Sequence, residues 1–351
     1  MSSVKIVYQA PSKILYDSIA AGQLEIGAAG GHAYDFLATC ALKQRYDLVA
    51  DQNAVRHDNE SMISLSKRLR RNSINADVVI KDAAIIALGK NNPTFHQIGI
   101  VHHIDEILAS KNLKYWLYFK LLKWRLRQLD QVVCVSNYWK VELEKLGCEK
   151  ITTIYNSFDL DEFVFDLDEV NSFKRKYRLT SDAPLIYVGN CKGGKGVEEV
   201  CQALGDGNYQ LIASGPVAKN SGPVRCLSLS RREYLLLLKA CDIVMTMSIM
   251  PEGWNRVAHE AMLCKTPVIG SGSGGMMELL KGGKQIVTNK FQSLTNDVDF
   301  VLSDKKNFEE NGYAFVQQFD LKYFSNAWIN LVSKVTMDPE SRKNRLMSKL
   351  I

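Results

Sequence analysis

Residues 248–278 read SIMPEGWNRVAHEAMLCKTPVIGSGSGGMME and carry the strongest structural signal in the chain. The Pro-Glu-Gly turn predicts that a helix begins here, with Glu252 at its start. Glu260 follows eight residues later, roughly 12 Å along the helix axis. An apolar strand and the glycine pair at 274–275 come next. Two carboxylates at a fixed spacing beside glycines indicate a loop that binds a ligand.

Upstream of this segment, residues 187–199 read YVGNCKGGKGVEE, a glycine-rich loop between a strand and a helix beginning near Val197. Backbone amides, the helix dipole and the ammonium groups of Lys192 and Lys195 favour a bound phosphate there. Taken singly, a glycine loop is a weak signal, and each carboxylate could be a solvated or dipole-complementing group. Because both loops follow apolar strands, their combination favours a functional site.

Short apolar runs alternate with helical stretches along the whole chain, which predicts parallel sheets covered by helices. The chain has 351 residues, and beyond about 250 to 300 residues chains usually split into domains. The expected strands cover residues 4–8, 48–50, 78–80, 98–101, 132–135, 185–188, 211–213, 243–247 and 267–269.

A polar, charged stretch at 151–178 interrupts this alternation. We therefore expect a Rossmann-like domain at 1–170 and a second at 171–330. We expect the tail at 331–351 to be helical and to pack back on the first domain. Because ligands gather at strand ends in open α/β sheets, two facing domains place the ligand in the cleft between them.

The composition is that of an ordinary globular protein, with 46% hydrophobic and 23% charged residues. No segment approaches the ~20 apolar residues of a membrane-spanning helix, and the N-terminus lacks the pattern of an export signal. We therefore expect a soluble, cytoplasmic protein. The net charge of +6 suits an anionic partner, such as a nucleotide diphosphate or a phospholipid surface.

The second half resembles the nucleotide-binding domain of glycosyltransferase family 4, retaining enzymes of the GT-B fold. Glu252 and Glu260 match the Glu-x7-Glu pair of that family, and residues 156–159 approach its Asn-Gly-Val-Asp element. Residues 189–196 approach its Gly-Arg-Leu-x-x-x-Lys-Gly loop. The resemblance runs from about residue 27 to 331 and is most specific between 189 and 278. It implies two Rossmann-like domains whose parallel sheets face each other across a cleft.

The first half resembles the family in two places. The glycine pair Gly30-Gly31 is similar to the one beside the donor phosphates, and residues 100–105, IVHHID, resemble the segment that carries the active-site histidine. A histidine at a strand end can hydrogen-bond a sugar hydroxyl or titrate near neutral pH. The alternative is a histidine satisfied within local packing. Both His102 and His103 remain candidates.

The resemblance implies retaining transfer of a glycosyl group from a nucleoside-diphosphate sugar to a hydroxyl of a glycan or lipid-linked acceptor, with no metal or other cofactor. The implied catalytic residues are Glu252, His102 and His103. The implied donor-binding residues are Gly30, Gly31, Gly189, Asn190, Lys192, Lys195, Gly253, Trp254, Asn255 and Glu260.

One departure concerns the phosphate-binding arginine of the family, which is replaced here by the uncharged Asn190. Lys192 compensates in charge, although an ammonium does not reproduce a guanidinium fork. This leaves a second hypothesis open, a subunit that binds nucleotide sugar but is impaired in catalysis. The Glu-x7-Glu spacing argues against a sugar-nucleotide epimerase. A dehydrogenase is disfavoured because no Gly-x-Gly-x-x-Gly follows the first strand.

Three Asp-x-Asp sequences, at 159–161, 166–168 and 297–299, resemble the metal site of the other glycosyltransferase fold, GT-A. Three unrelated occurrences in one chain suggest background, so we interpret them as solvated or capping carboxylates.

The stretch 114–127 predicts a helix rich in aromatic residues, with Lys120, Lys123 and Arg127 at positions i, i+3 and i+7. One interpretation is peripheral binding to the inner face of an anionic membrane, with a lipid-linked acceptor. The other is a core-packed helix with one solvated basic stripe. Nucleic acid is not expected, because no recognition helix or stacking module accompanies these residues.

Overall fold

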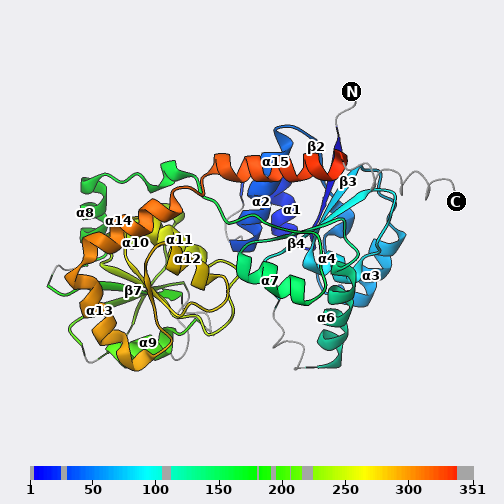
Figure 1. The fold of residues 1–351 in the computed structure, drawn as a ribbon. Helices are drawn as coiled ribbons and strands as arrows, with labels where there is room; N and C mark the ends of the chain where they lie inside the picture. Colours follow the sequence, from blue (N-terminus) through cyan, green and yellow to red (C-terminus); the bar gives the residue numbers. More distant parts are fainter. Residues whose placement is uncertain are drawn as a thin grey trace. The chain divides into compact units, whose positions relative to one another are not determined.

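The computed structural model describes residues 4–24, 30–104, 112–179, 182–190, 195–205, 207–215 and 224–337. The chain divides into two compact units, residues 1–157 with 322–351, and residues 158–321. Each unit contains one parallel six-stranded sheet with helices on both faces (Figure 1). This confirms the expected α/β class with two parallel sheets.

The sheet of the first unit has the strand order β2-β1-β3-β4-β5-β6. Its strands are β1 (Lys5–Gln9), β2 (Asp47–Ala50), β3 (Val78–Asp82), β4 (His96–Val101), β5 (Gln131–Cys134) and β6 (Ile151–Thr153). Its helices are α1 (Lys13–Ala21), α2 (Gly30–Lys43), α3 (Met62–Arg71), α4 (Ala83–Leu88), α6 (Leu113–Leu126) and α7 (Asn137–Lys145), with the short η1 (Gln52–Ala54).

The direction of each crossover decides which face a helix covers. The chain moves one way from β1 to β2 and the opposite way from β2 through β6. Because such crossovers are right-handed, α1 and α2 cover one face and α3, α4, α6 and α7 cover the other (Figure 1). The order reverses between β1 and β3, the kind of position at which open α/β sheets bind ligands.

The C-terminal helix α15 (Leu321–Met337) packs on the first unit almost along its whole length. Trp328 and Phe324 are fully buried beside Tyr34 of α2, and the Tyr46 hydroxyl lies 2.8 Å from the Ser333 hydroxyl. The tail expected at 331–351 is thus, as far as residue 337, the end of a helix that begins at Leu321. Residues 338–351 lie outside the described residues.

The sheet of the second unit has the strand order β12-β11-β10-β7-β8-β9. Its strands are β7 (Leu185–Asn190), β8 (Gln210–Ser214), β9 (Arg225–Leu227), β10 (Ile243–Thr246), β11 (Val268–Gly270) and β12 (Ile286–Val287). Its helices are α8 (Leu167–Lys176), α9 (Val197–Leu204), α10 (Arg231–Ala240), α11 (Arg256–Leu263), α12 (Met276–Gly282), α13 (Leu294–Ser303) and α14 (Lys305–Val316), with the short η2 (Leu160–Phe163) and η3 (Phe291–Ser293). The edge strands β9 and β12 were not expected, because two or three residues are too few to show a period.

The compact units divide at residue 157, whereas the sequence analysis placed the boundary at 170. The polar stretch after residue 157 packs on α10 of the second unit. The Arg232 guanidinium binds the Glu169 carboxylate at 2.5 Å and donates to the carbonyl oxygens of Glu162 and Val164. Charge pairing therefore holds a segment that shows no sheet-like pattern of its own.

Candidate functional site

The structure brings Lys195 and Glu252 together in the second unit. The strand order reverses between β7 and β10, which are neighbours in the sheet. The loops that follow these two strands therefore start side by side, one leading to Lys195 and the other to Glu252. The Lys195 Nζ lies 2.5 Å from the Glu252 Oε1, and the two side chains are 35% and 19% exposed. This pair occupies the position where sheets of this kind bind ligands.

Glu252 is held in place by a third loop, which follows β11. Its amide donates to the Ser273 carbonyl at 3.1 Å, and its carbonyl accepts from the Gly275 amide at 2.9 Å. Gly274 between them has φ +69°, and a Cβ there would collide with the Glu252 backbone. Only glycine fits such a position without strain, so the glycine pair fixes the Glu252 loop.

The expectation that Glu252 lies at a helix start was wrong. Helix α11 begins at Arg256, after Asn255, whose side chain accepts from the Ala258 amide at 2.9 Å and caps the helix. Asn255 has φ 71°, a left-handed conformation that Asn tolerates better than most residues. The Pro-Glu-Gly turn instead pairs with the loop after β11, and the distance estimated along a helix axis does not apply.

Glu260 is buried on α11, which excludes the alternative of a solvated carboxylate. Its Oε1 lies 2.6 Å from Arg231 Nη1, and its Oε2 accepts from the Tyr234 hydroxyl at 3.2 Å. Arg231 also binds Glu162 at 2.9 Å. Burial alone would lower the pKa of Arg231, but the charge and hydrogen bond of Glu260, joined by Glu162, outweigh it and raise that pKa.

The sequence analysis missed Arg231 and Tyr234. A signal was present, since Ser230 and Glu233 form a capping box that begins α10. Arg231 therefore lies in the first turn of a helix that follows a strand, the usual place for a ligand-facing side chain. What the sequence does not reveal is its partner, because Glu260 lies 29 residues away.

The remaining donor candidates of the second unit occupy different environments. Gly189 and Gly196 have φ of +108° and +72°, and a Cβ on Gly196 would overlap the Met247 backbone. Asn190 ends β7 opposite Ser214 and is half-buried. Lys192 lies outside the described residues. The loop thus ends tightly against Met247, the residue that follows β10.

Trp254 is buried, and its indole N–H donates to His259 Nδ1 at 3.0 Å. Burial, followed by the charge of Arg256, lowers the pKa of His259 to about 3, so this imidazole stays a neutral acceptor. The Trp254 side chain therefore packs inside the unit, and only its backbone is suited to a ligand. The neighbouring Gly253 is half-buried.

A second constellation lies in the first unit, where His102 follows β4. Its Nε2 lies 2.9 Å from the Asp35 Oδ1, and the two side chains are 22% and 3% exposed. Helix α2 begins at Gly30, and a Cβ on Gly31 would lie 3.4 Å from the His102 ring. His103 is exposed. The structure thus groups His102 with Gly31 and with Asp35, which the sequence analysis missed.

Asp82 adds a further carboxyl group to this constellation. Burial, and then the charge of Asp35, raises the pKa of Asp82 to about 6. The same side chain caps α4 by accepting from the Ala84 amide at 2.7 Å. Two carboxyl groups close to one imidazole make this a polar cluster next to the ends of β3 and β4.

Within the described residues, no group of three or more His, Cys, Asp or Glu side chains is arranged to hold a metal ion. Asp159 and Asp166 cap η2 and α8, and Asp297 accepts from the Ser293 hydroxyl at 2.8 Å. These three carboxylates therefore have local structural roles. None of the helices in the described ranges has both the length and the apolar character needed to cross a bilayer.

Comparison with known families matches both units of the chain. Residues 37–162 match a family described as Glycosyltransferase Family 4, and residues 170–315 match one described as Glycosyl transferases group 1. An uncharacterized glycosyltransferase of Methanocaldococcus jannaschii is 24% identical over 268 residues, which are 70% of each chain. N-acetyl-alpha-D-glucosaminyl L-malate synthase of Bacillus anthracis is 28% identical over 180 residues, 46% of this chain and 47% of the relative.

Solved structures with the same fold cover nearly the whole chain. Sucrose-phosphate synthase from Thermosynechococcus elongatus has a TM-score of 0.76 at 17% identity, over 95% of this chain and 99% of its own. HepE of Anabaena in complex with UDP-glucose has a TM-score of 0.70 at 16% identity, over 94% and 100%. At these identities the likeness shows the fold alone.

Proposed function

Since this chain belongs to the glycosyltransferases of GT-B type, we propose that it transfers a sugar from a nucleoside-diphosphate sugar to a hydroxyl group, with retention at the anomeric carbon. The observation that carries this proposal is the contact between Lys195 and Glu252 at the point where the strand order reverses. A cation for the diphosphate and a carboxylate for the sugar meet there.

Lys195 would meet the negative charge that develops on the leaving diphosphate. Its ammonium lies 2.5 Å from the Glu252 carboxylate. A diphosphate carries more negative charge than a single carboxylate and so attracts an ammonium more strongly. Donor binding would therefore draw Lys195 to the phosphates and release Glu252 toward the sugar hydroxyls. The dipoles of helices that begin beside the phosphates would add preorganised positive potential, an arrangement that can contribute several kcal/mol in enzymes.

Glu252 and the amides of residues 253–255 would hold the sugar and support positive charge on the ring. Glu260 would accept hydrogen bonds from the ribose, next to the Arg231 and Tyr234 that already fix its carboxylate. A uridine diphosphate sugar is the first donor to test, because the structurally similar HepE was solved with UDP-glucose. We further propose that the acceptor belongs to glycan or glycolipid assembly and that transfer needs no metal.

The experiment that tests this function is a screen of thermal stabilisation by uridine, guanosine and adenosine diphosphates and their sugars, since ligand binding raises apparent stability. Transfer is then measured with the stabilising donor, with and without EDTA. Stabilisation by a nucleotide sugar, followed by measurable sugar transfer, supports an active glycosyltransferase. Stabilisation without hydrolysis or transfer supports the impaired subunit suggested by Asn190. The absence of stabilisation by any nucleotide contradicts both.

We propose His102, not His103, as the imidazole that orients the sugar, because Asp35 holds it at 2.9 Å. Replacing Asp35 by Asn should lower kcat by about 10- to 100-fold, since an amide no longer selects the tautomer. KM for the donor should change little, and the pH profile of kcat should shift. The exposed His103→Ala is the matched control and should behave like the wild type. Unchanged kcat and pH profile in the Asp35 variant would remove His102 from this role.

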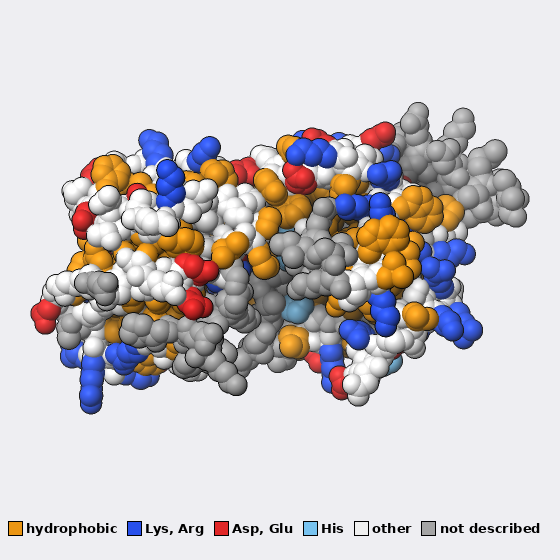
Figure 2. All heavy atoms as spheres, turned by 90° about the horizontal axis from the view of Figure 1, so that it is seen from below, with side chains coloured by type: hydrophobic (Ala, Val, Ile, Leu, Met, Phe, Trp, Pro, Cys, Tyr) orange, Lys and Arg blue, Asp and Glu red, His pale blue; other side chains and the backbone are white. Residues whose placement is uncertain are grey.

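Helix α6 offers a surface for peripheral membrane binding. It buries Phe119 and Leu122 but leaves Leu113, Trp116, Leu117 and Trp124 between 47% and 76% exposed. The Lys120 ammonium lies 5.5 Å from the centre of the Trp116 ring. Figure 2 shows hydrophobic and basic side chains interspersed on the face of this unit that it displays. The aromatic residues of α6 are exposed beside its lysines, which supports membrane binding over the interpretation as a core-packed helix with a solvated basic stripe. We therefore propose a lipid-linked acceptor at an anionic membrane.

The double variant Lys120→Glu and Lys123→Glu should reduce co-sedimentation with anionic liposomes at least about tenfold, because each lysine contributes about 1 kcal/mol near such a surface. Arg127 is left in place, since it binds the Leu146 carbonyl and supports α7. The control is Lys281→Glu with Lys284→Glu, an exposed pair in the second unit with the same change of net charge. Equal liposome binding by both double variants would exclude α6 as the membrane-binding surface.

A further inference from the structure

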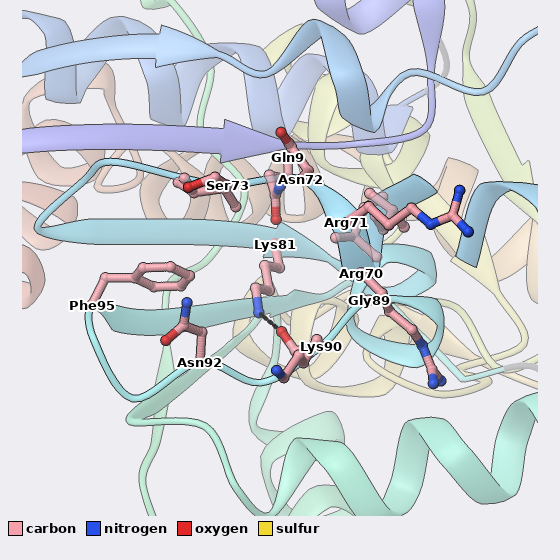
Figure 3. A pocket seen from close by; sticks show the side chains of 13 residues that line it. Gln9, Arg70, Arg71, Asn72, Ser73, Lys81, Gly89, Lys90, Asn92 and Phe95 are labelled. Carbon is pink, nitrogen blue, oxygen red and sulfur yellow. Dashed lines mark hydrogen bonds between the residues drawn. The ribbon is translucent and has the colours of Figure 1, made fainter. Parts of the chain in front are cut away.

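The first unit contains a cavity of about 280 Å³ that the proposed reaction does not use. It lies between the end of α3 and the loop from α4 to β4, over the strands β1 and β3 (Figure 3). Gln9 and Lys81 line it, whereas the adjacent residues Tyr8 and Asp82 lie near Asp35. Because successive residues of a strand point to opposite faces, the cavity and the His102 constellation lie on opposite sides of the sheet.

The lining of this cavity is strongly basic. Four of its residues are Arg70, Arg71, Lys81 and Lys90, and none of the described residues that line it is acidic. The side chains of Arg70, Arg71 and Lys90 are exposed and form no ion pair or hydrogen bond within the described parts of the chain. The dipole of α3 accounts for basic residues in its last turn, but it does not account for Lys81, which comes from a strand.

Lys81 is 2% exposed, and its hydrogen-bond partners within the described residues are neutral oxygens. Its Nζ donates to Gln97 Oε1 at 2.6 Å and to the Lys90 carbonyl at 3.2 Å. Figure 3 shows it extending toward that carbonyl, with Asn92 and Phe95 on one side and the two arginines on the other. Burial, followed by the charge of Arg125, lowers the pKa of Lys81 to about 8, against a smaller opposite effect of the Asp130 carboxylate.

A buried ammonium that is hydrogen-bonded to no carboxylate is costly unless an anion accompanies it. The nearby carboxylates are engaged elsewhere: Asp51 accepts from Gln9 and Asn72, and Asp130 from the Gln97 amide. An anion placed between Lys81 and the arginines would offset the desolvation and complete their hydrogen bonds. Guanidinium groups match the geometry of phosphate oxygens, and a phosphate monoester carries close to two negative charges at neutral pH.

We propose that this cavity is a binding site for a compact phosphate monoester or inorganic phosphate, separate from the donor loops of the second unit. Its volume is near the lower end for small-molecule pockets, which favours a ligand smaller than a nucleotide sugar. The Asn72, Ser73 and Asn92 side chains would supply further polar contacts. The site stands independently of the proposed transfer reaction.

The test titrates the full chain with inorganic phosphate and with glycerol 3-phosphate at constant ionic strength, by calorimetry and by hydrogen exchange. We expect saturable binding, with protection in peptides covering 69–74 and 89–95. Arg70→Gln with Arg71→Gln should weaken binding at least about tenfold. The control Lys120→Gln with Lys123→Gln removes the same charge from α6 and should bind normally. Tighter binding of the ester than of phosphate would identify a monoester as the ligand, and equal binding would identify the free ion.

Lys81→Met provides a second variant, since an apolar side chain of similar length fills the same space, and chemical denaturation of this variant shows whether the fold is kept. It should abolish saturable binding at every pH at which the wild type binds. In the wild type, affinity should fall as pH rises through about 8, because Lys81 loses its proton there. The proposal is overturned if the arginine variant binds like the wild type, if Lys81→Met retains affinity, or if protection appears only around 189–197.

Discussion

Replacing Glu252 by Gln should lower turnover at saturating donor by about 10²- to 10³-fold, the cost of removing one preorganised electrostatic contact to a transition state. The glutamine keeps the size of the side chain and removes its charge. The backbone of residue 252 remains fixed by Ser273 and Gly275, so the loop should keep its position. Donor affinity should change little, since the released Lys195 stays available for the diphosphate.

Single-turnover kinetics with saturating donor measure this effect separately from binding. Stability should hardly change, because a partly exposed ion pair such as that of Lys195 and Glu252 contributes about 0 to 1 kcal/mol. Glu198→Gln is the control, an exposed carboxylate in the first turn of α9 in the same unit. A Glu252 variant with wild-type single-turnover rates would contradict the catalytic role of this residue.

Replacing Glu260 by Gln should weaken nucleoside diphosphate binding by about 10- to 100-fold, the loss of one or two charged hydrogen bonds. Once the donor is bound, the Glu260 variant should react at a rate closer to that of the wild type than the Glu252 variant does. The side chain is 6% exposed and holds both Arg231 and Tyr234. We therefore also expect a loss of about 1 to 3 kcal/mol in the free energy of unfolding. The loss should not be larger, because Arg231 is 45% exposed and water still solvates its charge.

Calorimetric titration with the diphosphate and chemical denaturation measure the two effects of Glu260→Gln. Glu162→Gln is the control, since Glu162 is the other carboxylate on Arg231 but is 46% exposed. Its substitution should leave nucleotide affinity within about threefold. If the Glu162 and Glu260 variants lose the same affinity, the effect comes from Arg231 rather than from a ribose contact by Glu260. Equal and small losses of turnover in the Glu252 and Glu260 variants would remove both assigned roles.

Most strands were predictable because their signal is local. Continuous apolar runs such as that of β4, which is buried along its whole length, mark strands covered on both faces. The helix starts were less predictable. Asn255 takes a left-handed conformation and delays α11 to Arg256, because the preceding turn pairs with residues 273–275. A pairing partner so far along the chain leaves no periodic trace in the segment itself.

The sequence by itself determined that the chain forms two parallel α/β units with glycine-rich loops after their strands. It also marked Glu252 and Glu260 as candidate ligand-binding carboxylates. These signals could be read because each depends on residues close together in the chain. Only the tertiary structure decided which side chains meet. Lys195 reaches Glu252 across 57 residues, and His102 reaches Asp35 across 67. Such contacts follow from strand order, which reverses between β7 and β10 and between β1 and β3. Strand order is a property of the folded sheet, because it arises from burying all the apolar strands together and no single segment encodes it.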